Sequence, residues 1–467
     1  MQVYSTPHRA VVDFVPRHPD AVSMYVCGAT VQSEPHLGHG RYAVVFDMVR
    51  RYLRWRGYAV TYVRNITDID DKIIAAAAEA GEPVTARAER MTAMFAEAYE
   101  RLGVEAPDIE PKATEHVESM LDLIQRLIDR GLAYPAPNGD VYYAVRAYEP
   151  YGRLSGRRID ELRAGARVEV SEMKHDPLDF ALWKAAKPGE PSWDSPWGPG
   201  RPGWHIECSA MASQYLGSGF DIHGGGTDLI FPHHENEIAQ SEGASGETFA
   251  RYWLHNGLVN LGGEKMSKST GLLVDLTEAI DRYGGMTLRL FYLLAHYRSP
   301  IAYSEELLTA AGTAYQRLYR FAQRTHDLAA APDPGLMERF VTAMDDDFST
   351  PVALAALFDG VAEGNRLLDQ GEDAAAQAAA VREMSVVLGI RTDVQTLDGL
   401  SGPLQDLAAS FGLALGSPEE MIDGLLHARQ EARANGDYPR SDRIRQTLAE
   451  LGLMVEDTAD GSRWIRR

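Results

Sequence analysis

Ser23-Met24-Tyr25-Val26-Cys27 is a short apolar run, and His36-Leu37-Gly38-His39 follows it after a turn that contains glycine. A second apolar run, Ala59-Val60-Thr61-Tyr62-Val63, comes about twenty residues later. Between the two runs, apolar residues recur at helical spacing, and Gly57 suits the end of a helix; the recurring residues are Tyr42, Val45, Phe46, Val49 and Leu53. Strand, helix and strand predict a Rossmann-like α/β fold with a ligand-sized crevice at the carboxyl ends of the strands. Cys27, the histidine segment and Thr67 would lie on that rim.

The composition is that of an ordinary globular protein. The 467 residues are 45% hydrophobic and 24% charged, and the length suggests about three domains. A net charge of -21 excludes a protein that coats nucleic acid indiscriminately, although one basic face could still bind RNA. No apolar run approaches the roughly 18 residues of a membrane span, and Met1-Gln2-Val3-Tyr4-Ser5 lacks the features of a signal peptide. We therefore expect a cytoplasmic protein with no membrane partner.

The chain has two cysteines, Cys27 and Cys208, and each lies near other possible metal ligands. Burial as small hydrophobic side chains is the plainer interpretation, and a disulfide is disfavoured in a reducing cytosol. The segment His-His-Glu-Asn-Glu at 233–237 favours a metal. His233 and Glu237 are spaced i,i+4 and would share one helix face, whereas His234 and Glu237 are spaced i,i+3. Two thiolates, one imidazole and one carboxylate would form a tetrahedral zinc site, with either histidine as the ligand.

Lysine is scarce, because only seven of the 46 basic residues are lysines. Two of them, Lys265 and Lys268, stand close together in Glu264-Lys265-Met266-Ser267-Lys268-Ser269-Thr270, and no lysine follows. A retained pair of compact, mobile ammonium groups favours a site for anionic phosphates. A solvated turn is the alternative interpretation.

The amino-acid composition and the hydrophobic pattern change along the chain. From Pro135 to Gly203 it has short aromatic runs with many glycines and prolines, which predicts an insertion between two halves of the nucleotide fold. After about Pro300 it becomes rich in alanine and leucine with a helical pattern. We expect five parts, which are 1–134 (first half of the catalytic domain), 135–203 (connective insertion), 204–299 (second half), 300–416 (all-α helical bundle) and 417–467 (small C-terminal module).

The C-terminal stretch interleaves arginines with Tyr438 and Trp464. Such a pattern can hold phosphates and stack on unpaired bases. Acidic residues are interspersed among the arginines, so a salt-bridged solvated helix is an equally good interpretation of this stretch by itself.

The order of the two signatures, HLGH near the first strand and KMSKS far downstream, resembles class I aminoacyl-tRNA synthetases. Four further stretches narrow the resemblance to the cysteinyl-tRNA synthetase family. These stretches are Tyr25-Val26-Cys27-Gly28, Asn65-Ile66-Thr67-Asp68-Ile69-Asp70-Asp71-Lys72, Pro202-Gly203-Trp204-His205-Ile206-Glu207-Cys208-Ser209-Ala210-Met211 and Phe220-Asp221-Ile222-His223-Gly224-Gly225-Gly226. The resemblance runs nearly from one end of the chain to the other.

The resemblance implies roles for individual residues. The family's zinc ligands fall on Cys27, Cys208, His233 and Glu237, which selects His233 over His234 by resemblance and not by spacing. The ATP-handling and catalytic positions fall on His36, His39, Lys265 and Lys268. Thr67, Trp204 and His223 match positions that line the amino-acid pocket.

The implied reaction joins L-cysteine and ATP into cysteinyl-adenylate and pyrophosphate, and then transfers cysteine to the 3′ end of tRNA(Cys). Zinc would select the substrate thiolate, Mg²⁺ would accompany ATP, and the histidines and lysines would act by positioning and charge stabilisation. We expect a monomer, a C-terminal anticodon-binding module, and no protein nucleophile.

Two alternatives belong to other classes. One is the ligase that joins cysteine to glucosaminyl-inositol in mycothiol synthesis, and the other is a non-catalytic paralogue that binds tRNA. The long helical tail disfavours the first, and the two retained signatures disfavour the second. The chain departs from the family pattern at Leu37, a volume-conserving change, and at the turn Gln32-Ser33-Glu34-Pro35, which lacks the family's aromatic residue.

Overall fold

The computed structural model describes residues 1–161, 173–261, 264–265, 274–392, 400–458 and 461–466. The chain divides into two compact units, Met1–Thr392 and Asp393–Arg467. Within the described ranges, no helix is both long and apolar enough to cross a membrane.

A four-stranded parallel sheet forms the centre of the first unit, and its strand order is β10-β9-β3-β4. Two strands precede the predicted insertion and two follow it; they are β3 (Ala21–Val26), β4 (Ala59–Arg64), β9 (Phe220–Gly226) and β10 (Ala250–Asn256). The predicted α/β class with a Rossmann-like start is confirmed, and the two predicted strands correspond to β3 and β4.

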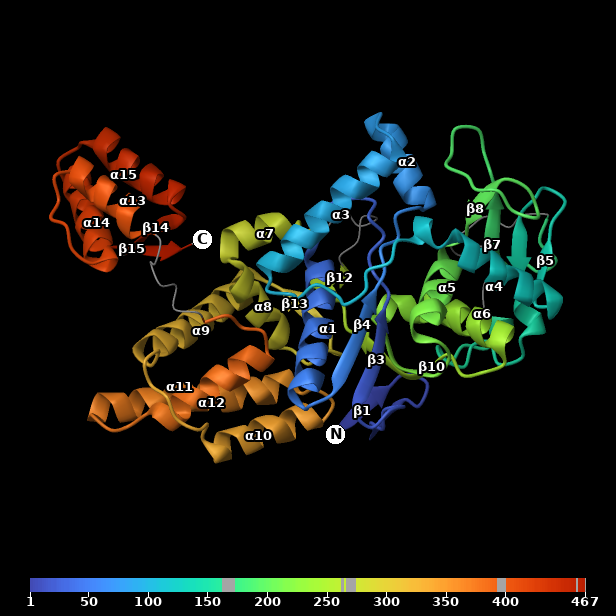
Figure 1. The fold of residues 1–467 in the computed structure, drawn as a ribbon, viewed down its shortest axis with the longest axis horizontal. Coiled ribbons are helices and arrows are strands. Elements are labelled where there is room, and N and C mark those ends of the chain that lie inside the picture. Colours follow the sequence, from blue (N-terminus) through green and yellow to red (C-terminus); the bar gives the residue numbers. More distant parts are fainter. Residues whose placement is uncertain (162–172, 262–263, 266–273, 393–399, 459–460, 467) are drawn as a thin grey trace. The chain divides into compact units, whose positions relative to one another are not determined.

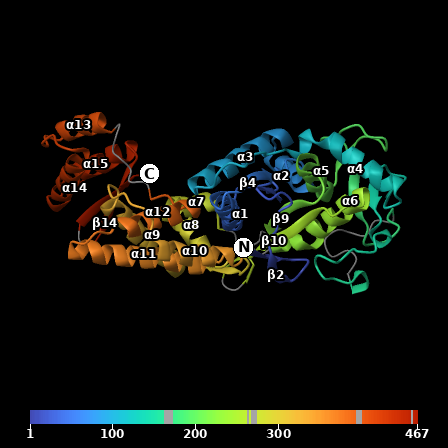
Figure 2. The same cartoon turned by 60° about the horizontal axis from the view of Figure 1, so that its bottom comes forward.

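The sheet is covered on both faces, because alternate residues of each strand enter different cores. Met24 and Val26 of β3 pack in the core that contains helix α1 (Leu37–Trp55). Tyr25, between them, packs in a second core with α4 (Val117–Asp129), α5 (Trp204–Leu216) and α6 (Glu235–Ser245). Figures 1 and 2 show α1 on one side of the strands and α4 to α6 on the other. The apolar periodicity that predicts a helix after the first strand is confirmed by α1.

Four further elements belong to this unit, the helices α2 (Asp71–Ala80) and α3 (Val84–Arg101) and the 3-10 turns η1 (Ala113–Glu115) and η4 (Thr227–Leu229). The helix that carries Glu237 begins at Glu235, and the π-helical turn η5 (Ile230–His234) precedes it. His233 and Glu237 therefore lie on either side of a junction between two helical elements.

The inserted region contains an antiparallel sheet in the order β5-β6-β7-β8, with the 3-10 turns η2 (Val145–Ala147) and η3 (Ile159–Glu161). Its strands are β5 (Ala133–Pro135), β6 (Val141–Tyr143), β7 (Phe180–Ala185) and β8 (Gly200–Pro202). Lys184 of β7 and Arg201 of β8 both bind the carboxylate of Asp71, the first residue of α2. These ion pairs hold the insertion against the carboxyl end of the parallel sheet.

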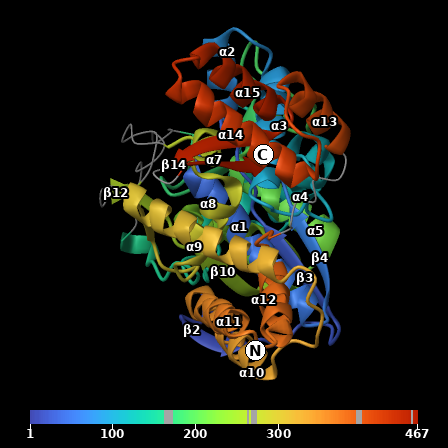
Figure 3. The same cartoon turned by 90° about the vertical axis from the view of Figure 1, so that its left-hand side faces the viewer.

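Two small sheets flank the parallel sheet. One is the hairpin β1 (Gln2–Ser5) and β2 (Ala10–Asp13), and the other has the order β12-β11-β13, with strands β11 (Val259–Leu261), β12 (Glu264–Lys265) and β13 (Ile301–Tyr303). Helices α7 (Leu276–Tyr283) and α8 (Gly285–Leu293) lie between the last two strands in the sequence. The helical part that follows consists of α9 (Glu305–Arg324), α10 (Pro334–Asp345), α11 (Thr350–Gln370) and α12 (Ala375–Val387), of which α10 to α12 pack side by side (Figure 3).

The second unit has its own hydrophobic core. It contains α13 (Ser401–Ser410), α14 (Pro418–Ala434), α15 (Tyr438–Glu450) and the hairpin β14 (Leu453–Thr458) with β15 (Gly461–Arg466). The hairpin was not expected, because the sequence after Pro300 reads as almost entirely helical.

Candidate functional site

Four side chains from separate parts of the chain meet beside the carboxyl end of β3. Cys27 follows β3, Cys208 lies on α5, His233 lies in η5 and Glu237 lies in the first turn of α6. Their possible ligand atoms all lie within 4.8 Å of one another, and all four residues are buried. The structure therefore brings together the two cysteines, one histidine and one glutamate that the sequence singles out.

The contacts within this cluster are short. The Cys27 thiol donates to Oε1 of Glu237 at 3.1 Å, and Nε2 of His233 lies 3.2 Å from the same oxygen. Burial raises the pKa of the Cys27 thiol, and the neighbouring Cys208 and Glu237 raise it further. Burial also raises the pKa of Cys208. Two thiols, an imidazole and a carboxylate are the donors of tetrahedral zinc sites, so the residues fit such an ion.

A second set of donors overlaps with the first and consists of Cys27, His223, His234 and Glu237. The two sets share Cys27 and Glu237. Nε2 of His234 lies 3.9 Å from Oε1 of Glu237, farther than the 3.2 Å of His233. The first set also has two thiols against one, and soft sulfur donors favour zinc. Distance and donor chemistry both support His233.

Two further side chains, the half-buried His205 and the buried Asn65, contact these donors. Nδ1 of His205 lies 2.9 Å from Nδ1 of His233, so one of the two nitrogens donates to the other, and Nε2 of His233 faces Glu237. Asn65 accepts from the Gly28 backbone N–H at 2.9 Å, and its Oδ1 is 3.6 Å from the Cys208 sulfur. Such outer partners orient metal ligands. Sequence reasoning missed both residues, although His205 stands three positions before Cys208.

The three residues expected in the amino-acid pocket surround the same cluster. The hydroxyl of Thr67 donates at 2.9 Å to Glu207, the residue that precedes Cys208. The Trp204 ring lies 4.2 Å from that of His233, between ring centroids. Nε2 of His223 is 2.8 Å from Oε2 of Glu237, and its ring stacks on Trp253. A ligand that reaches the thiols would therefore also lie near these three residues.

Gly28 allows the backbone after β3 to approach the backbone after β4. A Cβ atom at this position would lie 1.6 Å from the carbonyl oxygen of Asn65. No side chain can be accommodated there without movement of the main chain. The absence of a side chain thus places Cys27 next to the segment that carries Asn65 and Thr67.

The HLGH segment forms the amino end of α1. His36 is the N-cap, and its Nδ1 accepts from the Gly38 backbone N–H at 3.1 Å. Nδ1 of His39 accepts from the His36 backbone N–H at 3.1 Å, and the two rings stack with centroids 3.7 Å apart. An Nδ1 that accepts a hydrogen bond carries no proton, so each neutral ring has its proton on Nε2. Both histidines can therefore donate from Nε2.

Residues that follow the KMSKS segment form backbone hydrogen bonds with the HLGH segment and the turn before it. The Leu37 N–H donates to the Val274 carbonyl at 3.2 Å, and the Leu276 N–H donates to the Pro35 carbonyl at 2.9 Å. Lys265 belongs to β12, where its backbone pairs with Asn260. Lys268 lies outside the described residues. The unusual turn 32–35 is held by Arg87, whose Nε donates to the Gln32 carbonyl at 3.0 Å.

Comparison with known proteins agrees with this geometry. Three family models match, described as tRNA synthetases class I (C) catalytic domain at residues 13–313, DALR domain at 339–393, and cysteinyl-tRNA ligase anticodon binding domain at 419–464. A cysteine–tRNA ligase of Thioalkalivibrio sulfidiphilus is 51% identical over 468 residues, which cover 100% of both chains. One of Alkalilimnicola ehrlichii is 53% identical, covering 97% of both chains. The chain belongs to the cysteine–tRNA ligase family.

As a member of this family, the chain is an ATP-dependent ligase with cysteine, ATP and tRNA as its substrates. A solved methionyl-tRNA synthetase of Mycobacterium tuberculosis, in complex with methionyl-adenylate, is 18% identical with a TM-score of 0.56 and covers 79% of this chain and 89% of its own. That likeness concerns the fold alone. The match at residues 419–464 favours the tRNA ligase over the sugar ligase. The catalytic-domain match and the relatives named as ligases favour it over the non-catalytic paralogue.

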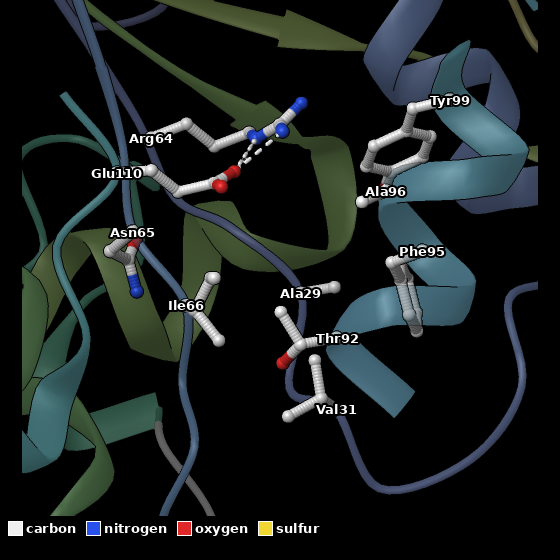
Figure 4. Close-up of a pocket in the computed structure, with 10 residues that line it drawn as sticks. All are labelled: Ala29, Val31, Arg64, Asn65, Ile66, Thr92, Phe95, Ala96, Tyr99 and Glu110. Carbon is white, nitrogen blue, oxygen red and sulfur yellow. Dashed lines mark hydrogen bonds and ion pairs between the residues drawn. The ribbon is translucent and has the colours of Figure 1, made fainter. Parts of the chain in front are cut away.

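Two cavities lie near the family's signatures. One of about 320 Å³ is bordered by His36, Arg87, Arg90 and Asp275, beside the HLGH turn. This volume lies at the lower end of the range for ligand pockets. The other, of about 30 Å³, lies between Asn65 and Tyr99, where Arg64 pairs with Glu110 (Figure 4). It has room for about one water molecule and is too small for a substrate.

Proposed function

We propose that this chain activates L-cysteine with ATP to give cysteinyl-adenylate and pyrophosphate, and transfers the cysteine to the 3′ end of tRNA(Cys). The observation that carries the proposal is the convergence of Cys27, Cys208, His233 and Glu237 at the rim of the parallel sheet, within 4.8 Å. This donor set suits zinc, with a soft thiol substrate as a further ligand. Zinc, when bound, supplies a cation that prefers a thiolate to a hydroxyl.

The protein's own residues then bind and orient the substrates. His36 and His39 donate from Nε2 to the ATP phosphates, and the capping hydrogen bonds of α1 support this tautomer. Lys265 and Lys268 neutralise the charge that grows on the departing pyrophosphate. Mg²⁺ accompanies ATP without a protein cage of its own. Thr67, Trp204 and His223 line the cysteine pocket.

Discrimination against serine follows from the preference of zinc for a thiolate over a hydroxyl. A pocket that relied on shape would gain only about 1 to 3 kcal/mol from so small a difference. We further propose that the protein works in the cytoplasm, since both cysteines are free in the structure and zinc binding needs reduced thiols. A monomer is proposed as well. The five parts expected from the sequence, with limits at 134, 203, 299 and 416, stay a proposal.

The test offers radiolabelled cysteine and ATP to the zinc-loaded protein, with bacterial tRNA in one tube and glucosaminyl-inositol in another. We expect label in acid-precipitable tRNA that ribonuclease removes. Label on the sugar alone would favour the mycothiol ligase, and label on neither would favour the non-catalytic paralogue. A zinc-depleted but folded protein that activated cysteine normally and rejected serine would contradict the role of the metal.

A further inference from the structure

Glu207 is a buried carboxyl that the metal cluster does not use. It lies on α5 between Trp204 and Cys208. The three residues stand at positions i, i+3 and i+4 and therefore share one face of the helix, the face of the proposed cysteine pocket. Its Oε2 accepts from the Thr67 hydroxyl at 2.9 Å. Its Oε1 is fully buried and has no hydrogen-bond partner among the described residues. A buried acceptor without a partner is costly, so it calls for a ligand or another explanation.

The hydroxyl of Thr67 is held in one orientation. It gives its only proton to Glu207 at 2.9 Å and accepts from Nδ2 of Asn65 at 3.3 Å. A hydroxyl has one donor and two acceptor sites, so the site that is left on Thr67 is an acceptor. Thr67 can therefore receive a hydrogen bond from a substrate donor but cannot give one.

Other acidic groups near this point are engaged elsewhere. Asp68 accepts from the backbone N–H of Thr114 at 3.0 Å and from its hydroxyl at 2.6 Å. Asp70 caps α2 by accepting from the Lys72 N–H at 2.9 Å. Both are partly exposed, whereas Glu207 is 0% exposed. Of these three carboxyls, only Glu207 presents a buried oxygen without a partner.

We propose that Glu207 is the positioning residue for the α-ammonium of cysteine, because it fixes Thr67 as an acceptor and supplies an oxygen of its own beside it. This inference rests on the proposed function. An ammonium group has three donors and no acceptor, which matches the acceptor sites that Thr67 and Oε1 of Glu207 offer side by side. Burying an ammonium needs an opposite charge nearby, and the arriving cation also offsets the cost of burying the carboxylate.

The test compares two thiols that differ only in the ammonium. Cysteamine carries it at neutral pH, and 2-mercaptoethanol has a hydroxyl in its place. Both are titrated calorimetrically into the zinc-loaded full-length protein and its variants. Because the difference in thiol acidity is the same for every variant, it cancels when the ratio of the two affinities is compared between proteins.

For Glu207→Gln we expect cysteamine binding to weaken by about 10-fold or more, the usual size of a hydrogen bond to a charged group, with 2-mercaptoethanol changed by less than about 2-fold. Thr67→Val should act in the same direction if Glu207→Gln does not fold. Asp68→Asn removes a charge nearby and should leave the ratio unchanged. In pyrophosphate exchange, Glu207→Gln should raise KM for cysteine and leave KM for ATP as it was.

An unchanged ratio in folded Glu207→Gln, or an equal loss for both thiols, would overturn the inference. Cysteine-dependent exchange by the unaltered protein tests the proposed function separately. Its absence would remove that function, while the ratio of thiol affinities would still decide whether Glu207 recognises an ammonium.

Discussion

The carboxylate of Glu237 lies near three imidazoles, with distances of 2.8 Å to His223, 3.2 Å to His233 and 3.9 Å to His234. With Cys27, a metal site around this carboxylate could therefore be completed either by His233 and Cys208 or by His223 and His234. Distance and the second thiol favour His233, and the Nδ1 contact with His205 presents its Nε2 to the cluster. His234 has its Nδ1 engaged by His255 at 2.7 Å instead.

His233→Ala should reduce bound zinc from about one ion per chain to well under half, because it removes one of four ligands from the site. His234→Ala is the matched control, one position away, and should keep most of its zinc. Metal content after dialysis against a weak chelator measures both. Loss of zinc in the His234 variant, with retention in the His233 variant, would show that the overlapping donor set holds the ion.

Gly28→Ala should destabilise the first unit by about 3 kcal/mol or more, because the added carbon clashes with backbone that cannot move cheaply. Cysteine-dependent exchange should fall with it, since Cys27 is the preceding residue. Gly312→Ala is the control: its Cβ would contact Thr287 at an ordinary 3.6 Å, within helix α9. That change should stabilise by about 0.5–1 kcal/mol. Chemical denaturation measures both, and equal effects would contradict the clash.

At the scale of elements, a buried ion pair connects α1 with α8. Arg289 binds Asp47, and it also donates to the Leu102 carbonyl at 3.2 Å and the Leu388 carbonyl at 2.8 Å. Arg289→Met should cost about 3–5 kcal/mol, because one partner of a buried pair is removed. Arg54→Met, on α1 like Asp47 but at a more exposed pair with Asp108, should cost less than about 1 kcal/mol. Similar losses of unfolding free energy for the two variants in urea would show that the buried pair contributes no more stability than the exposed one.

The folded first unit should become less stable in acid because of His255, a residue of β10 that contacts Thr6, just after β1, and His234 of η5. Burial, and next to it the charge of His223, lower the pKa of His255 from 6.5 to about 3. Its nitrogens contact Thr6 at 2.6 Å and His234 at 2.7 Å. Above pH 6.5 the ring is neutral in both states. Between pH 6.5 and 3 only the unfolded chain takes up the proton, so the unfolding free energy falls by up to about 1.4 kcal/mol per pH unit.

His255→Gln removes this titration, and the comparison isolates it from other groups. Between pH 7.5 and 5.5 the unaltered protein should lose about 1 kcal/mol more unfolding free energy than the variant. Equal losses in the two proteins would show that His255 does not carry the acid sensitivity.

These elements also show what a sequence can reveal. The strands before and after α1, and α1 itself, were predicted because their apolar patterns are strong and local. The short strands of the insertion were not, since pairs such as Val141 with Trp183 depend on contacts distant in sequence. The cysteines, Glu237 and a histidine ligand at 233 or 234 could be proposed from residue type and spacing, and the family resemblance selected His233. His205 and Glu207 could not, because their roles appear only when α5 packs beside η5 and β4.

At the scale of the whole molecule, the chain has separate cores. Among the described residues, the buried side chains of the two cores of the first unit end at Ile390, and those of the core of the second unit begin at Leu404. The cysteine, histidine and glutamate cluster and the HLGH turn all lie in the first unit, whereas the match to the anticodon-binding family lies at 419–464. The candidate metal cluster and the match to the anticodon-binding family therefore lie in different units.

This division makes a separation of activities testable. A chain ending at Thr392 keeps both cores of the first unit and should retain cysteine-dependent pyrophosphate exchange within about 3-fold of the full chain. Its kcat/KM for charging tRNA should fall by about 100-fold or more, equivalent to about 2.7 kcal/mol of lost contacts. The two assays are run on the same preparations, with circular dichroism to verify folding. If exchange fell as far as charging in a folded chain, the second unit would contribute to activation itself, and the separation of the cores would not mark a separation of functions.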